Sequence, residues 1–338
     1  MSSTTPTFSV CIANYNGEAM LHDCIQSILN QSGDHTTEII VHDDASTDAS
    51  LRVLAQFEQV IVIESAENVG FCVANNRMAE RARGDYVLLL NNDAALLPDA
   101  LSALRETIGS TAVTGIATLP QCDWVTGKLV DRGCLLDLFY NPIPNMDSSR
   151  ADVAMVIGAC LLMRREDWVI LGGFPVWFES IAEDLYLCCL ARLRGWPIRV
   201  AARSGYRHRQ GASFSGERES PQSPTSTFRR RRLSERNKTY SMIICTPTVL
   251  IWPLLLLHLL LLLAEGFLLA CLRAKPRIFS EIYWGALYSC IGNVSRLRGL
   301  RKRVQQSRTT TAREYFRPFR VFPFKLRLLF ARGLPRIR

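Results

Sequence analysis

Three short polar segments carry the residue types that bind a charged ligand. They read Asn14-Tyr15-Asn16-Gly17, Asp43-Asp44-Ala45-Ser46-Thr47-Asp48 and Asn91-Asn92-Asp93, and each follows an apolar, β-rich run. A carboxylate at such a point can hold a divalent cation through hard oxygen atoms, and the cation can bridge a diphosphate. Asp93 is well placed for this chemistry. The chain has no GxGxxG after the first run and no GxxxxGK[ST], which excludes the dinucleotide-binding and P-loop motifs.

The elements that must position these segments alternate along residues 1–200. Short β-rich runs cover residues 8–13, 38–42, 60–64 and 85–90. Stretches with helical spacing separate them, for example Met20, Leu21, Cys24, Ile25, Ile28 and Leu29. This alternation predicts an α/β fold with a parallel, doubly wound sheet and helices on both faces. In such sheets ligands bind at the carboxyl ends of the strands, where the polar segments fall.

The composition is that of a folded protein. The 338 residues are 48% hydrophobic and 21% charged, which excludes wholesale disorder and collagen-like or low-complexity architectures. The 11 cysteines form no CxxC pair and lie mostly in apolar runs, so we expect buried thiols in a reducing compartment, without disulfides or a zinc site. The first residues show no secretory signal, and we expect the protein to begin in the cytoplasm.

Charge is divided unevenly along the chain. Residues 1–200 carry 13 basic and 25 acidic side chains, whereas residues 201–338 carry 27 and 6. A basic segment suits nucleic acid or an anionic membrane surface. Here the arginines flank apolar segments and belong to no recognisable nucleic-acid motif. We therefore expect an anionic membrane surface, and no nucleic acid, as a partner.

Two apolar stretches lie in this basic part. Residues 241–264 contain no charged side chain, and the run resumes after Glu265 as far as Leu272. That length suits a bilayer. Both flanks are basic, RRRRLSERNK before and RAKPR after, which favours monotopic attachment with both ends cytoplasmic. The alternative is a membrane-spanning hairpin formed with the second stretch, residues 278–295.

Several linked segments resemble family 2 glycosyltransferases with the GT-A fold. Over roughly residues 7–240 they follow in the family's order as FSVCIANYNGEAMLHDCIQSIL, EIIVHDDASTDAS, NVGFCVANN, GDYVLLLNNDAALLPDAL, IGACLLMRREDWVILGGF and AEDLYLCCLARLRGW. Within the family the chain is similar to bacterial rhamnosyltransferase-type enzymes of cell-surface polysaccharide synthesis. The resemblance implies a GT-A nucleotide-sugar-binding catalytic domain over residues 1–240 and a helical, membrane-associating region over residues 241–338.

The resemblance also implies a donor site. Tyr15 matches the residue that stacks on the nucleotide base, and Asp44 matches the carboxylate that accepts the base imide N–H. Gly70 matches a loop close to the ribose and pyrophosphate, although it also suits a simple turn. The remaining donor-binding matches are Asn68, Asn76, Asn92 and Asp93.

A metal site follows from the same alignment. Asn91-Asn92-Asp93 aligns with the DxD motif, and its first position is Asn, which leaves Asp93 as the carboxylate that would hold Mg²⁺ or Mn²⁺. His208 matches a further metal or pyrophosphate contact, with an ordinary surface histidine as the alternative.

The proposed base comes from the family's acidic motif at a helix start. Asp184 matches the general base, which takes the proton from the acceptor hydroxyl, and Glu183 is its orienting neighbour. The alternative is that both carboxylates only favour the positive end of the helix. The chain departs from the family pattern at Tyr186 and Leu190, where Asp and Arg are usual, and at Pro175.

Together these matches predict an inverting glycosyltransferase at the cytoplasmic face of the bacterial inner membrane. It would move a sugar, with rhamnose a candidate, from a nucleotide-diphosphate donor to a lipid-linked or cell-surface polysaccharide acceptor. The departures at Asn91, Tyr186 and Leu190 motivate an alternative, a catalytically inactive membrane scaffold in a polysaccharide-assembly complex. The retained carboxylates Asp44, Asp93 and Asp184 argue against that alternative.

Overall fold

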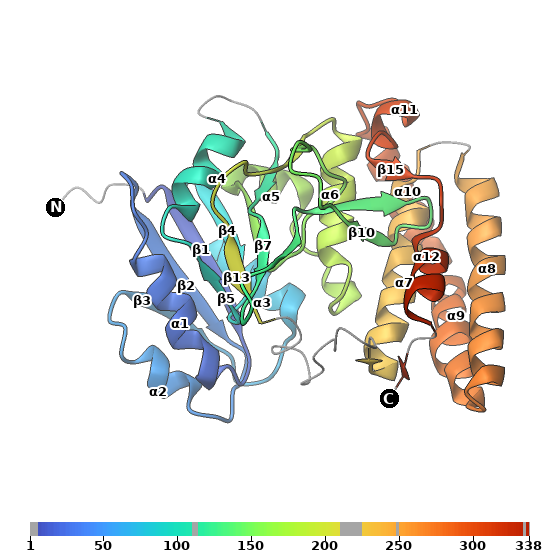
Figure 1. Cartoon of the computed structure of the whole chain (residues 1–338), viewed down its shortest axis with the longest axis horizontal. Helices are drawn as coiled ribbons and strands as arrows, with labels where there is room; N and C mark the ends of the chain where they lie inside the picture. The colour runs from blue at the N-terminus through green and yellow to red at the C-terminus, as the bar shows by residue number, and fades with distance from the viewer. Residues whose placement is uncertain (1–5, 110–113, 210–224, 248–249, 334–335, 338) are drawn as a thin grey trace. The chain divides into compact units, whose positions relative to one another are not determined.

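The computed structural model describes residues 6–109, 114–209, 225–247, 250–333 and 336–337 (Figure 1). The chain packs into two compact units. Unit 1 contains Met1–Cys134, Pro144–Glu179 and Trp196–Gly216, and unit 2 contains Leu135–Ile143, Ser180–Gly195 and Glu217–Arg338. This division differs from the predicted ranges 1–240 and 241–338, because residue 240 lies within one continuous helix, α7 (Phe228–Cys245). The assignment of catalysis and membrane association to those ranges stays a prediction.

Unit 1 alternates strands and helices, as predicted. Its strands are β1 (Phe8–Asn14), β2 (Thr37–Asp43), β3 (Val60–Glu64), β4 (Tyr86–Leu90), β5 (Ala94–Leu96), β6 (Ile116–Thr118), β7 (Gln121–Asp123), β8 (Leu129–Asp131), β11 (Cys160–Arg164), β12 (Ile198–Val200) and β13 (Tyr206–His208). Its helices are α1 (Glu18–Leu29), α2 (Ser50–Leu54), α3 (Phe71–Arg81), α4 (Ala100–Ile108), α5 (Arg165–Leu171) and the 3₁₀-helix η1 (Val176–Phe178). The predicted β-rich runs agree with β1 to β4.

The main sheet has the strand order β12-β6-β11-β4-β1-β2-β3. β1 pairs in parallel with β2 and β4, and β2 pairs in parallel with β3. The predicted parallel arrangement is confirmed for these four strands. The sheet as a whole is mixed, because β11 begins opposite the carboxyl end of β4, with Cys160 facing Leu90, and runs back along it.

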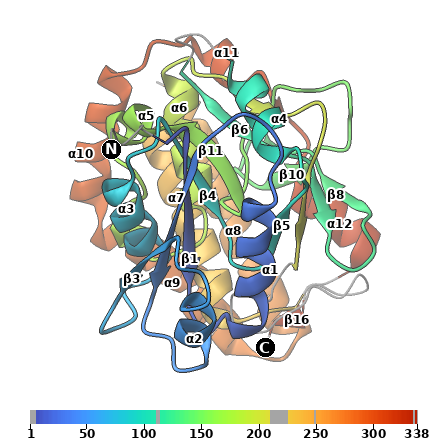
Figure 2. The same cartoon turned by 90° about the vertical axis from the view of Figure 1, so that its left-hand side faces the viewer.

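Helices cover both faces of this sheet. Val10 and Leu88 belong to one buried cluster, which Leu21 of α1 and residues of α4 complete. Their neighbours Cys11 and Leu89 are buried too and point to the other face, since side chains alternate along a strand. There α3 packs against β1 and β2. Figure 2 shows α1 and α3 on either side of the strands.

A second sheet brings distant polar residues together. Its strand order is β5-β13-β7-β8. β13 runs antiparallel to β5, with His208 opposite Ala94, and parallel to β7, with Tyr206 opposite Gln121. Because His208 is opposite Ala94, it lies next to Asp93, the residue that precedes Ala94.

The cysteines are free thiols, most of them buried, as the sequence predicts. Cys122 is half-buried and Cys271 is exposed, whereas the other nine are buried. Burial raises the pKa of Cys160 to about 12, so this thiol stays protonated and unreactive near neutral pH.

Unit 2 is largely helical. Its elements are β9 (Cys134–Asp137), β10 (Pro142–Pro144), α6 (Glu183–Leu193), β14 (Thr225–Ser226), α7, α8 (Ile251–Leu272), the π-helix η3 (Ile278–Trp284), α9 (Gly285–Gly292), α10 (Val294–Gln306), α11 (Ala312–Tyr315), β15 (Phe319–Arg320), α12 (Phe324–Arg332) and β16 (Arg336–Ile337). Short strands form the sheets β10-β9-β15 and β14-β16. α7 is the central helix and packs against α6, α8, η3, α9 and α10.

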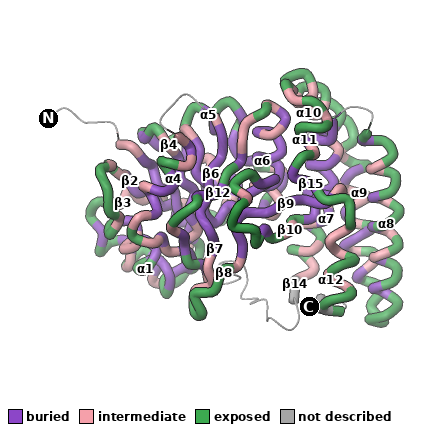
Figure 3. Tube along the Cα trace, turned by 45° about the horizontal axis from the view of Figure 1, so that its top comes forward, coloured by how far each residue is buried: buried purple, intermediate pink, exposed green. Residues whose placement is uncertain are grey.

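The apolar run predicted to meet a membrane, residues 241–272, is divided in the structure. Residues 241–245 are the largely buried end of α7, and Ile251–Leu272 form α8. Within the described part of the chain, α8 is the one helix long and apolar enough to cross a bilayer, which on its own is weak support for membrane association. Its polar residues point into unit 2: His258 Nε2 lies 2.9 Å from Thr239 Oγ1, and Tyr283 donates to Glu265 over 3.0 Å. Figure 3 shows exposed residues recurring along α8, and they include Trp252, Leu256, Leu257, Leu260, Leu261, Phe267, Leu268 and Leu272.

A buried carboxylate with three cationic partners holds α7 to its neighbours. The Glu235 side chain is 1% exposed and lies 2.8 Å from Lys325 Nζ, 3.1 Å from Lys238 Nζ and 3.3 Å from Arg231 Nε. Arg231 and Lys325 also pair with Glu265. Burial opposes the charge of Glu235, but the three cations outweigh it and hold its pKa well below the ordinary value.

We expect Glu235→Gln to destabilise the protein by about 3–5 kcal/mol, because the substitution leaves the buried Lys238 without its carboxylate partner. The matched control is Glu281→Gln, whose ion pair with Arg277 is exposed and contributes little to stability. Urea unfolding measures both. Because the pKa of Glu235 is lowered, its stabilisation is present at neutral pH and is lost as the pH falls below the ordinary carboxylate range. Equal losses in the two variants at neutral pH would contradict this account.

Candidate functional site

The carboxyl ends of β1 and β2 and the segment after β4 meet in a buried polar network. Asn14 Nδ2 donates to Asp43 Oδ2 over 2.8 Å, and Asn92 Nδ2 donates to Asn14 Oδ1 over 2.7 Å. Ser46 Oγ also donates to Asp43, over 2.8 Å. The three polar segments found in the sequence therefore lie side by side. Asn92 was predicted to bind the donor, whereas Asn14 and Asp43 were not singled out, although both stand within those segments.

Tyr15 follows this network and has 47% of its surface exposed. The turn that carries it needs Gly17, since a Cβ there would lie 2.1 Å from Asn14 Oδ1 and 2.3 Å from Asn92 Nδ2. An exposed aromatic ring beside a fixed strand end suits stacking on a flat ligand. The role of Tyr15 in base stacking stays a prediction.

Asp44 organises the loop that precedes α3. Its Oδ1 accepts from the Val69 backbone N–H over 2.7 Å and its Oδ2 accepts from the Gly70 N–H over 2.9 Å. Asn68 Nδ2 reaches the Asp44 carbonyl at 3.4 Å. Gly70 has φ +85°, a conformation that L side chains disfavour. The structure thus brings together three of the predicted donor-binding residues: the Asp44 carboxylate holds the Gly70 N–H, and the Asp44 main-chain carbonyl lies within reach of the Asn68 amide.

Asn76 lies on α3 and binds the main chain of a different turn, at Phe174. Its Nδ2 donates to the Phe174 carbonyl over 2.8 Å, and its Oδ1 accepts from the Phe174 N–H over 2.9 Å. Gly173 is close enough that a Cβ there would lie 2.6 Å from Asn76 Oδ1. Both polar atoms of Asn76 therefore hold the main chain, and a direct role in donor binding stays a prediction.

Asp93 and His208 form a buried pair. His208 Nε2 lies 3.0 Å from Asp93 Oδ1, and both side chains are buried. On its other side His208 Nδ1 lies 3.3 Å from Gln121 Oε1, which also accepts from Tyr206 Oη over 2.8 Å. The sequence offered His208 as a metal contact or a surface residue, and its burial excludes an ordinary surface position. Gln121, which orients the ring, was not anticipated.

The Asp93 and His208 side chains suit a divalent cation. A carboxylate oxygen and an imidazole nitrogen are both accepted by Mn²⁺, whereas Mg²⁺ prefers the carboxylate. No cluster of three or more His, Cys, Asp or Glu side chains able to hold a metal occurs in the described ranges. Water and phosphate oxygens would therefore supply most of the coordination of a bound cation.

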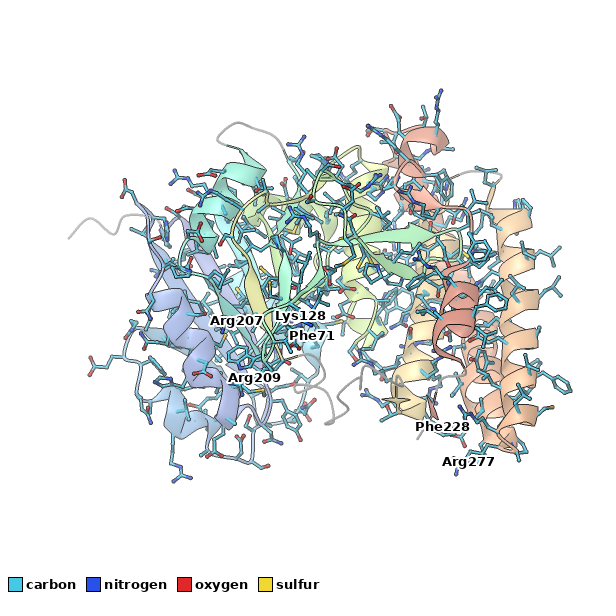
Figure 4. The ribbon with its side chains drawn as sticks, in the orientation of Figure 1. Phe71, Lys128, Arg207, Arg209, Phe228 and Arg277 are labelled. Atoms are coloured by element: carbon cyan, nitrogen blue, oxygen red, sulfur yellow. The ribbon has the colours of Figure 1, made fainter. Side chains whose placement is uncertain are left out.

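Arg207 and Arg209 flank His208 in the sequence and are labelled in Figure 4. The Arg209 guanidinium lies 4.0 Å above the Trp124 ring, and Nη2 donates to Asp23 Oδ2 over 2.7 Å. Its backbone N–H donates to the Asp93 carbonyl over 2.9 Å. Arg209 therefore fixes the main chain at Asp93 as well as adding positive charge near it.

Unit 2 contains the two predicted catalytic carboxylates, at the first residues of α6. Glu183 is buried, with 7% of its surface exposed, whereas Asp184 is half-buried. Burial, and then the charge of Asp184, raise the pKa of Glu183 to about 8. Within the described part of the chain, Glu183 Oε2 has no hydrogen-bond partner. Glu183 is therefore mostly protonated near neutral pH.

The backbone before these carboxylates is strained. Ile181 and Ala182 have φ values of 68° and 66°, a left-handed conformation that is unfavourable for a β-branched residue. Asn237 of α7 holds this segment, since its Nδ2 donates to the carbonyls of Ser180 and Ile181 over 2.9 and 2.8 Å. Strain of this kind is typical of functional sites. Asn237 had no signal in the sequence, because its partners are more than fifty residues away.

The departures from the family pattern on α6 are buried. Tyr186 and Leu190 pack inside unit 2, where burial raises the pKa of the Tyr186 hydroxyl. Both side chains therefore contribute to the core instead of presenting charge.

Comparison with known proteins agrees with this geometry. Residues 9–170 match the family model "Glycosyl transferase family 2". The poly(ribitol-phosphate) beta-glucosyltransferase of Bacillus spizizenii is 30% identical over 208 residues, which cover 59% of this chain and 31% of the relative. The chain spans less than half the length of the curated relatives that it matches most strongly.

Solved structures show the same fold. TarS residues 1–349 of S. aureus, in complex with UDP-GlcNAc, align with a TM-score of 0.58 and 19% identity over 91% of this chain and 89% of that one. The mannosyltransferase PcManGT of Pyrobaculum calidifontis, in complex with GDP-Man and Mn²⁺, aligns with a TM-score of 0.53 and 17% identity over 94% of this chain and 86% of that one. Residues 9–170 thus match the glycosyl transferase family 2 model, and the chain has a GT-A-like fold.

Proposed function

We propose that this chain is an inverting glycosyltransferase that moves a sugar from a nucleotide-diphosphate donor to a lipid-linked or cell-surface polysaccharide acceptor. The observation that carries the proposal is the buried Asp93–His208 pair, with its 3.0 Å contact, beside the strand ends of a family 2 domain. A relative named for glucosyl transfer to poly(ribitol phosphate) supports a cell-wall polymer as the acceptor class.

In this proposal unit 1 binds the donor. Tyr15 stacks on the base, Asp44 accepts from its edge, and Asn68 and Gly70 lie along the ribose and pyrophosphate. Asp93 and His208 hold Mg²⁺ or Mn²⁺, and the chemistry that the cation supplies is neutralisation of charge on the leaving diphosphate. Asn92 and Asn76 keep the strand-end loops in place through the bonds described above.

The acceptor is activated, in this proposal, by Asp184. The attacking hydroxyl gives its proton to the Asp184 carboxylate as its oxygen bonds to the anomeric carbon and the bond to the diphosphate breaks. Direct displacement inverts the anomeric configuration. Glu183, protonated near neutral pH, keeps a second negative charge away from the attacking oxygen.

The proposed location is the cytoplasmic face of a membrane, held monotopically through α8. His258 and Glu265 support a helix with one side packed on protein, because both bond to partners within unit 2. The second apolar stretch, residues 278–295, is divided between η3, α9 and the start of α10, which also favours monotopic attachment over a spanning hairpin.

The proposed activity is tested by incubating the purified chain with Mn²⁺ or Mg²⁺ and a panel of UDP-, dTDP- and GDP-sugars, dTDP-rhamnose included. Slow release of nucleoside diphosphate from one donor is the expected result. Binding of a donor without hydrolysis, and without transfer to any isolated wall polymer or lipid-linked acceptor, would favour the inactive scaffold instead.

Metal-coupled donor binding should depend on Asp93. We expect Asp93→Asn to abolish the increase in nucleoside diphosphate affinity that Mn²⁺ causes, because the variant loses the carboxylate charge but keeps the side-chain size. Asp85→Asn, an exposed position in the same unit, is the control and should keep the increase. Calorimetric titration with and without Mn²⁺ measures it. An unchanged increase in Asp93→Asn removes Asp93 from the site.

The two carboxylates of α6 should differ. We expect Asp184→Asn to transfer at least about a hundredfold more slowly while binding the donor normally, the loss typical of a missing base. Glu183→Gln should stay active at neutral pH, because Gln resembles the protonated carboxyl. In the wild type, Glu183 ionises as the pH rises through about 8, and any change in the transfer rate that this causes should be absent from Glu183→Gln. Normal transfer by Asp184→Asn together with an inactive Glu183→Gln would exchange the two roles.

Membrane topology has its own test. A reporter at Lys275, between α8 and η3, should stay on the cytoplasmic side if the attachment is monotopic. Labelling of a cysteine introduced at position 275 by an impermeant reagent from outside would show the spanning hairpin. Cys271 is exposed and should be replaced by Ser first.

A further inference from the structure

A basic pocket lies in unit 2 between α10 and the start of α8. It has a volume of about 400 Å³ and is lined by Trp252, Arg298, Arg301, Lys302, Gln305 and Arg308. Four of these six side chains are cationic, and none is acidic. None of its lining residues belongs to the proposed donor site or to the carboxylates of α6, and nothing in the proposed reaction uses them.

The spacing of the basic residues along α10 explains why they line one pocket. Arg298, Arg301, Lys302 and Gln305 stand at positions i, i+3, i+4 and i+7, so they share one face of α10. Arg301 is fixed, because its Nη1 donates to the Ile243 and Thr246 carbonyls near the end of α7, each over 2.7 Å. The guanidinium is thereby held among three further cationic side chains that line the same pocket.

The other cations lack a carboxylate partner. Across the part of the chain that the structure describes, Arg298, Lys302 and Arg308 form no ion pair with Asp or Glu. Elsewhere in unit 2 the buried cations are neutralised, as Lys238 is by Glu235. Like charges gathered around a hollow attract an anion, and Arg and Lys side chains suit a phosphate in particular.

An apolar surface begins at the same place. Trp252 is 70% exposed and stands in the first turn of α8. Leu256, Leu260 and Phe267 are exposed at steps of four, four and seven residues beyond it, so a row of apolar side chains leads away from the pocket along one side of the helix. Tryptophan favours the level of lipid head groups, where its ring is buried and its N–H is hydrated. A ligand with a phosphate for the pocket and hydrocarbon chains for the exposed side of α8 is a phospholipid.

We propose that this pocket binds the phosphate of an anionic phospholipid whose acyl chains lie over the exposed face of α8. The proposal goes beyond the membrane attachment suggested above, because it names a head-group site and a lipid class. It does not depend on glycosyl transfer, so its failure and the failure of the proposed activity are separate results.

Vesicle flotation of the full chain tests this site. We expect binding to phosphatidylcholine vesicles that contain phosphatidic acid or phosphatidylglycerol, and at least about tenfold weaker binding for Arg298→Gln/Lys302→Gln, since the phosphate loses two of its direct ligands. The matched control is Arg303→Gln/Arg313→Gln, which removes the same charge from exposed positions outside the pocket. The general attraction is lost from both variants, so the pocket variant should bind at least about tenfold more weakly than this control. Equal losses in the two variants, or equal binding to purely zwitterionic vesicles, overturn the proposal.

Two further measurements keep the outcome decisive. Trp252→Phe should remove most of the tryptophan fluorescence change on adding anionic vesicles, with circular dichroism confirming that each variant is folded. Inorganic phosphate should compete only weakly, because it lacks the acyl chains. Displacement from vesicles by low concentrations of inorganic phosphate would identify a soluble phosphate site instead. Preference for a polyprenyl phosphate over the phospholipids would identify an acceptor-lipid site, and either result contradicts the phospholipid assignment.

Discussion

Asp93 and His208 are 115 residues apart in the sequence, and their side chains meet because β13 pairs with β5 one residue beyond Asp93. Asp93 follows the carboxyl end of β4, which brings it to the same sheet edge as Asn14 and Asp43. The second sheet then adds an imidazole that no parallel strand of the main sheet could supply at that point. The donor chemistry proposed for the chain depends on this register, since a slip of one residue would turn His208 to the opposite face.

In unit 2, buried charged and polar side chains are paired with one another. α8 is apolar on the outside and polar where it meets α7, so His258 and Glu265 interrupt its sequence without exposing polar groups on its outer face. Glu265 shares Arg231 and Lys325 with Glu235, and these ion pairs link α8 and α12 to α7. Packing on protein from one side leaves the leucines of the other side available to a lipid surface. The basic face of α10 then lies next to the first turn of that apolar row.

Much of the fold was predictable from local pattern. β1, β2 and β4 appear as near-continuous apolar runs because they are buried on both faces of the sheet, whereas the apolar run of β3 forms a half-buried edge strand. The helices between these strands show regular apolar spacing. The three-residue strands β5, β7, β8 and β13 are too short to carry such a pattern, so the sequence did not indicate the second sheet. The antiparallel direction of β11 was not predicted either, because strand direction depends on where the chain re-enters the sheet.

Some residues of the candidate site could be predicted from local sequence motifs, and others could not. Asp44, Asp93 and Asp184 were found because they stand in motifs, whereas Gln121 and Asn237 act through contacts made only in the folded chain. Neighbouring residues on a helix point about 100° apart. Two adjacent carboxylates at a helix start therefore differ in burial, but only the packing of unit 2 decides that Glu183 is the buried one.

The most direct test of the central claim is a crystal structure of the chain with Mn²⁺ and the nucleoside diphosphate of its donor, with the cation located by its anomalous signal. We predict a Mn²⁺ peak bonded to an Asp93 carboxylate oxygen and to His208 Nε2, with the diphosphate on its open side and the base against Tyr15. A nucleotide bound in the crystal with Mn²⁺ held elsewhere, or with the Asp93–His208 contact intact and no cation beside it, would contradict the account.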